Sequence, residues 1–148
     1  MKTPTDVLRE EHDVVLRILD KLEKSLEKDT KESEKNINIL EKEFRRHSLN
    51  KEEKALFLEI EKFMPREGGP TGMMILEHED LVKLIKEFNK AIKAKNFEKV
   101  SEIGNHLINL LRQHIDKENN VLFMMAEMHL SEKQKELILK KFKRIDSQ

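Results

Sequence analysis

The sequence contains no cysteine, no tryptophan and no tyrosine among its 148 residues. Without cysteine the chain can form no disulfide, offer no thiolate ligand to a metal and hold no iron–sulfur cluster. Without tyrosine and tryptophan it lacks the side chains that usually relay aromatic radicals. These absences exclude several kinds of redox site, but they do not fix a compartment.

An excess of charge of one sign is also lacking. Twenty-nine Lys and Arg residues balance 29 Asp and Glu residues, and because a polyanion is usually bound by a basic surface, we expect no nucleic-acid partner. No apolar run approaches the roughly 18 residues of a membrane span, and the start, MKTPTDVLREEHD, lacks the apolar segment of a signal peptide. These features predict a soluble, cytoplasmic protein with no membrane partner.

Glycine and proline are scarce, at four and three residues, and most of them gather in the segment PREGGPTG. This segment is the one clear loop. Elsewhere apolar residues recur at helical spacing, which predicts a single domain over 1–148 with helices at about 5–28, 32–63, 71–94, 96–129 and 131–145. Four long helices with short connections indicate an all-α fold, an antiparallel up-down-up-down four-helix bundle with a short C-terminal helix.

Each long predicted helix carries one histidine in its apolar face: His12, His47, His78 and His114. Two of them are followed by a carboxylate that returns to the same face, Glu52 and Glu118. A single histidine on an apolar face is usually a hydrogen-bonded core residue, but one in each of four helices is hard to attribute to chance. Imidazole and carboxylate donors together suit iron, manganese and zinc, and helical bundles hold di-iron carboxylate sites. The pattern therefore predicts a buried metal site.

The second predicted helix has one irregular step. Its apolar face follows normal helical spacing as far as His47, after which the next position would be Lys51, a poor core residue. The pattern resumes instead at Glu52 and continues through Leu56. A π-bulge accommodates such a step, and π-bulges occur often at functional sites. A plain kink near Asn50, or two shorter helices, are the alternatives.

The neighbours of the six polar residues carry further predictions. In the fourth helix the apolar face is expected to continue past Glu118 through Val121 and Met125. Glu11 and Glu77 are expected either to face solvent or to orient a histidine ring. His106 lies off the apolar face and is not expected to bind metal, and His129 is expected at the surface or as a charge partner at the C-terminal end of its helix. The methionines at positions 73, 74, 124, 125 and 128 are expected in the core, where Met74 and Met125 could also limit solvent at the metal.

Over nearly its whole length the sequence resembles the hemerythrin-like, or HHE cation-binding, domain family. The similar segments are LREEHDVVLRILDKL at 8–22, RHSLNKEEKALF at 46–57, GGPTGMMILEHED at 68–80 and HIDKENNVLFMMAE at 114–127. The resemblance implies a four-helix bundle around a non-haem di-iron site with an oxo or hydroxo bridge; zinc and manganese are the alternative metals. The metal ligands that it implies are His12, His47, Glu52, His78, His114 and Glu118, with both glutamates bridging. Glu53 is an alternative to Glu52.

The function that the resemblance implies is the binding or sensing of a small diatomic ligand such as dioxygen or nitric oxide, together with a redox partner. Oxygen-carrying hemerythrins have a further histidine where this sequence has Met74, which disfavours a reversible oxygen carrier. The alternatives are a di-iron oxidoreductase acting on nitric oxide or peroxide, and a structural bundle with adventitious zinc. We predict no catalytic residue and favour a metal-binding protein over a dedicated enzyme, because the sequence contains no nucleophile–base pair, phosphate loop or GxSxG segment.

Overall fold

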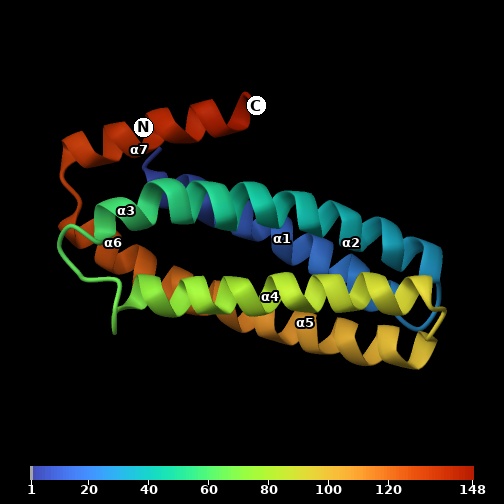
Figure 1. Ribbon diagram of the computed structural model, residues 1–148. Coiled ribbons are helices and arrows are strands. Elements are labelled where there is room, and N and C mark those ends of the chain that lie inside the picture. Colours follow the sequence, from blue (N-terminus) through green and yellow to red (C-terminus); the bar gives the residue numbers. More distant parts are fainter. Residues whose placement is uncertain (1) are drawn as a thin grey trace.

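The computed structural model describes residues 2–148, and within that range the chain is all-helical, as predicted, with no strand (Figure 1). In chain order the helices are α1 (Pro4–Ser25), α2 (Thr30–Phe44), η1 (Arg45–Leu56), α3 (Phe57–Ile60), α4 (Pro70–Lys93), α5 (Phe97–Lys117), η2 (Glu118–Leu122), α6 (Phe123–His129) and α7 (Glu132–Asp146). The segments η1 and η2 are π-helical, and the others are α-helical. No helix in this part of the chain is long and apolar enough to cross a membrane.

Several of these helices join end to end. The α2, η1 and α3 segments form one continuous rod, and α5, η2 and α6 form another. These two rods lie side by side with two more, the single helices α1 and α4. Helix α1 packs against α2 and α5, and α4 packs against α5 and α2. Figure 1 shows the α1–α2 and α4–α5 connections at one end of the molecule, and the loop before α4 at the other end beside α6 and α7.

Local signals at the helix ends explain where the chain turns. Thr3 caps α1 through a capping box with Asp6, and Asp29 caps α2 by accepting bonds from two backbone N–H groups. Ser131 and Gln134 form the capping box that starts α7. These side chains satisfy the first N–H groups of each helix, which have no partner within the helix itself.

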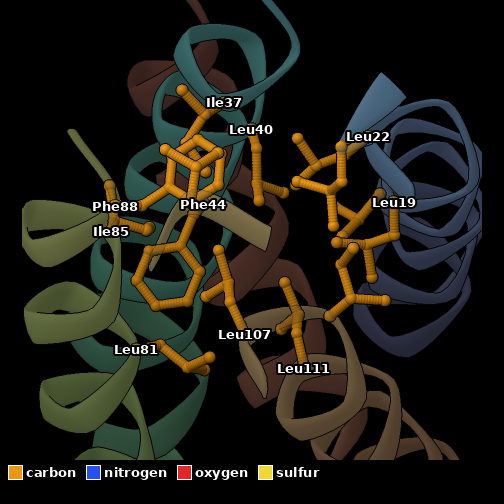
Figure 2. Packing of buried hydrophobic residues seen from close by; sticks show 14 of the residues in the cluster. Leu19, Leu22, Ile37, Leu40, Phe44, Leu81, Ile85, Phe88, Leu107 and Leu111 are labelled. Atoms are coloured by element: carbon orange, nitrogen blue, oxygen red, sulfur yellow. The ribbon is translucent and has the colours of Figure 1, made fainter. Parts of the chain in front are cut away.

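The core consists of two apolar clusters. The larger one fills the middle and the α1–α2 end of the molecule, where leucine, isoleucine and phenylalanine side chains of α1, α2, α4 and α5 point toward one another (Figure 2). The smaller one, at the α7 end, includes Leu8, Phe57, Met74, Phe123 and Phe142. On each of the four rods a buried histidine lies in sequence between members of the larger and the smaller cluster. A polar layer is therefore enclosed by apolar packing on both sides.

The structure confirms the π-bulge interpretation of the second helix and extends it, because η1 is a π-helical segment of 12 residues. It also shows that the predicted apolar face beyond Glu118 was wrong. Val121 is 55% exposed, whereas Leu122 and Phe123 are buried. The cause is η2: its i→i+5 hydrogen bonds widen the turn and move the buried face by one residue.

The predicted methionine packing is only partly right. Met74 is 4% exposed and packs in the smaller cluster. In contrast, Met73, Met124 and Met128 are each more than half exposed.

Candidate metal centre

The six residues singled out in the sequence converge in the polar layer. They form two groups whose potential ligand atoms lie within 4.8 Å of one another: His12, His47, Glu52 and Glu118, and Glu52, His78, His114 and Glu118. All six residues are at most 2% exposed. The two groups share both glutamates, so that the site has two adjacent halves with a histidine pair in each.

Each glutamate reaches into both halves of the site. One oxygen of Glu52 lies 3.0 Å from Nε2 of His47, and the other lies 3.2 Å from Nε2 of His78. Glu118 repeats the arrangement, with one oxygen 3.0 Å from Nε2 of His12 and the other 3.4 Å from Nε2 of His114. A carboxylate with one oxygen directed at each of two positions can bridge two cations.

The opposite nitrogen of each histidine ring is fixed by a hydrogen bond. Nδ1 of His47 donates to Glu11 at 2.9 Å, and Nδ1 of His114 donates to Glu77 at 2.8 Å. Of the two alternatives expected for Glu11 and Glu77, the structure shows that they orient histidine rings. Because Nδ1 carries the proton in each bond, the neutral ring presents a lone pair on Nε2 toward the centre of the site.

The remaining two rings are held in the same way. Nδ1 of His78 donates to Glu53 at 2.6 Å, and Nδ1 of His12 donates to Asn119 at 2.7 Å. Glu53 therefore lies on the outer side of the His78 ring, and Glu52 is the one inside the cluster. Asn119 was not singled out in the sequence, because an asparagine beside a predicted ligand carries no distinctive signal.

The π-helical segment η1 explains how Glu52 reaches the interior. Its buried residues come in adjacent pairs: His47 with Ser48, Lys51 with Glu52, and Ala55 with Leu56. A turn wider than that of an α-helix places two neighbouring residues inside on each turn. The expectation that Lys51 is unsuited to the interior was wrong, since its side chain is fully buried beside Glu52.

The site contains buried polar atoms without a hydrogen-bond partner. Both carboxylate oxygens of Glu52, Oε2 of Glu118 and Nε2 of His47 are in this state within the described residues, because their close contacts at 3.0 to 3.4 Å lack the geometry of a hydrogen bond. Such atoms are rare and costly in folded proteins. They belong to residues whose potential ligand atoms lie within 4.8 Å of one another, and nitrogen and oxygen donors are those that iron, manganese and zinc accept. The residues present therefore fit a metal site.

Charge pairing shifts the titration of these residues in the metal-free protein. Burial alone lowers the pKa of His47, but the Glu52 carboxylate outweighs it and raises the pKa to about 10. Burial likewise lowers the pKa of His114, but Glu118 outweighs it and the pKa rises to about 10. Burial raises the pKa of Glu118, yet His114 and His12 hold it well below its usual range. His47 and His114 are therefore protonated at neutral pH in the metal-free protein, so a metal bound by them would have to displace protons.

Aromatic rings enclose the cluster. Phe123 stacks on His12 with ring centroids 5.2 Å apart, and Phe57 stacks on His78 at 6.0 Å. Phe44 meets His78 edge-on at 5.6 Å. The other two histidines of the chain, His106 and His129, are exposed and belong to neither group. The site is thus a compact cluster of polar side chains in an apolar interior.

A model of the hemerythrin HHE cation-binding domain matches residues 3–126, which include all six residues of the two groups. The chain belongs to the hemerythrin HHE cation-binding domain family. No curated protein and no solved structure matches it significantly. The family assignment and the buried His and Glu cluster agree on a metal-binding domain.

Proposed function

We propose that this protein holds two iron ions in its polar layer and uses them to bind or sense a small diatomic ligand, with dioxygen first and nitric oxide second. The observation that carries the proposal is the pair of four-residue groups that share Glu52 and Glu118. The proposed scaffold is an antiparallel up-down-up-down bundle. Iron bound here would supply a redox-active centre with room for one further small ligand.

The ligand assignment follows from the two halves of the site. His12 and His47 would hold one ion, His78 and His114 the other. Glu52 and Glu118 would bridge them, and their two negative charges would offset the repulsion between neighbouring cations. The chain has no thiolate, which disfavours copper(I). Iron is preferred over zinc and manganese because of the resemblance to hemerythrins.

The space beside the cluster supports a small ligand. A cavity lined by Val15, Phe44, Ser48, Leu111 and Ile115 adjoins the histidines, and its free space is close to what one water molecule needs. The small size of this space excludes an organic substrate. A molecule of two atoms fits these limits.

A second space, at the surface, shares a lining residue with this cavity. A crevice between the α2–η1 rod and α4 has Leu49, Val82 and Ile85 among its lining residues, together with charged residues. Phe44 lines both this crevice and the cavity beside the cluster. We propose that the Phe44 side chain, which borders both spaces, controls ligand entry.

The proposal is tested by spectroscopy of the protein loaded with iron. The ferric protein should show near-ultraviolet absorption typical of a bridged di-iron centre, and this absorption should shift when azide is added. The reduced protein should respond to dioxygen or nitric oxide. A protein that takes up zinc in preference to iron would overturn the proposal, and sustained turnover of nitric oxide or peroxide with a reductant would show an oxidoreductase instead.

A further inference from the structure

Helix α7 follows the part of the chain that matches the family model, yet it packs against the metal-binding rods. The match ends at residue 126, and α7 begins at Glu132. Its Ile138 and Phe142 are buried in the smaller apolar cluster. Its main neighbour is η1, the π-helical segment that carries two of the six clustered residues.

A chain of polar contacts connects the end of α7 to the metal centre. Asp146 lies 2.8 Å from Nζ of Lys51. Lys51 donates to Oε2 of Glu11 at 2.5 Å. The other oxygen of Glu11 accepts the 2.9 Å bond from Nδ1 of His47. Three contacts thus lead from the last residue of α7 to a histidine whose Nε2 faces the site.

Arg46 also connects Asp146 with Glu11 directly. Its guanidinium donates to Glu11 at 3.0 Å and to Asp146 at 2.6 Å. Glu11 therefore accepts bonds from three side chains, His47, Lys51 and Arg46, and remains ionised. Burial raises the pKa of Glu11, but the bonds from His47 and Lys51 outweigh it and bring the pKa to about 2.

Burying the charged side chain of Lys51 costs free energy that packing alone does not explain. Its side chain is 0% exposed, and its ammonium group lies 5.4 Å from the centre of the Phe142 ring. Removing an ammonium group from water carries a free-energy penalty that its ion pairs only roughly offset. An apolar side chain would fill the same space without that cost, so the buried charge points to a role in positioning Glu11.

We propose that Asp146 and Lys51 are positioning residues for His47, and that α7 thereby controls how tightly the cation between His12 and His47 is held. Asp146 fixes the Lys51 ammonium, Lys51 fixes the Glu11 carboxylate, and Glu11 fixes the His47 ring. Partners that orient a metal-binding histidine strongly affect metal affinity. The inference rests on the proposed binding of two cations.

The other half of the site has no such connection to α7. His78 and His114 are oriented by Glu53 and Glu77, and neither glutamate makes a hydrogen bond or ion pair with α7 in the described part of the chain. Disturbing Asp146 should therefore weaken one cation and spare the other. This asymmetry separates a positioning role from a general loss of stability, which would release both.

The test is cation release from the full chain loaded with Co²⁺, whose absorption spectrum reports ligand geometry. After a chelator is added, Asp146→Asn should release one Co²⁺ per chain about tenfold faster than the wild type, the low end of the range typical of such partners. The second Co²⁺ should leave at the wild-type rate. Glu136→Gln is the matched control, because Glu136 is exposed on the same helix and pairs with no residue within 2–148.

A second variant, Lys51→Met, breaks the path at its centre and should give the same one-sided release together with a changed Co²⁺ spectrum. If both variants released both ions at the wild-type rate, the inference would be overturned. It would also be overturned if the variants released the two ions equally faster than the wild type. Failure of the wild type to bind two cations would instead defeat the proposed function, so the two outcomes are distinguishable.

Discussion

At the scale of single residues, each of the four histidines uses its two ring nitrogens for different purposes. Nδ1 donates to a carboxylate or amide oxygen, and Nε2 faces Glu52 or Glu118. The outer bond fixes the ring, and the inner nitrogen is left for a cation. The site is thereby oriented before metal arrives, which reduces the ordering that metal binding must impose.

This arrangement predicts the pH dependence of the metal-free protein. The pKa values of His47 and His114 are about 10 and that of His78 is about 8, all above the ordinary 6.5. A histidine whose pKa is raised by folding stabilises the protein fully below its unfolded pKa, and this stability is lost as the pH rises through the folded pKa. The free energy of unfolding, measured with urea, should therefore fall between about pH 7 and pH 10.

Substitutions locate the source of this fall. His47→Gln removes one of the three titrating groups and should reduce the slope. His106→Gln, at an exposed position, should leave it unchanged. A metal-free wild type whose stability is constant from pH 7 to pH 10 would contradict the ion pairing described here.

Glu118 offers a sharper test, because it belongs to both groups. Glu118→Gln removes the charge that both cations would share, so metal analysis after equilibrium dialysis should show loss of both ions. His47→Ala should lose only one. Glu102→Gln, an exposed change of the same kind on α5, is the control and should keep the wild-type content. Retention of both ions by Glu118→Gln would remove this residue from the ligand set.

At the scale of elements, the two π-helical segments account for most of what sequence reasoning missed. Spacing of three and four residues was enough to predict helices and to find the four histidines. The same spacing misplaced Val121 and judged Lys51 unfit for the interior, because a π-helix buries a different set of positions. The five-residue spacing from His47 to Glu52 indicated the π-helical segment η1. The spacing of the predicted apolar face around Glu118 is regular and gave no indication of η2.

Phe44, at the junction of α2 and η1, carries a prediction about ligand entry. Phe44→Leu should widen the connection between the surface crevice and the cavity beside the cluster. Azide should then bind to the iron-loaded protein several-fold faster in stopped-flow measurements. Phe88→Leu makes the same change in the same apolar cluster but away from both spaces, and equal azide rates in the two variants would show that Phe44 does not control entry.

At the scale of the whole molecule, a polar layer lies between two apolar clusters, and every one of the four rods contributes to it. The sequence predicted this layer because each histidine lies in an apolar face. It could not predict the path from Asp146 to His47, since Asp146 contacts residues about a hundred positions earlier in the chain. Contacts of that kind leave no periodic signal in the sequence.

The polar layer also links metal binding to folding. Burying six ionisable side chains reduces the stability of the fold. A bound cation would satisfy the carboxylate oxygens of Glu52 and Glu118 that lack a hydrogen-bond partner. Loading with metal should therefore raise the thermal unfolding midpoint of the wild-type chain.

We propose that one buried cluster holds two cations through the shared glutamates Glu52 and Glu118. Anaerobic titration of the metal-free protein with Fe²⁺, followed by removal of unbound iron and metal analysis, tests it most directly. We predict two irons per chain in the wild type. Saturation at one iron, or no retained iron, would contradict the account.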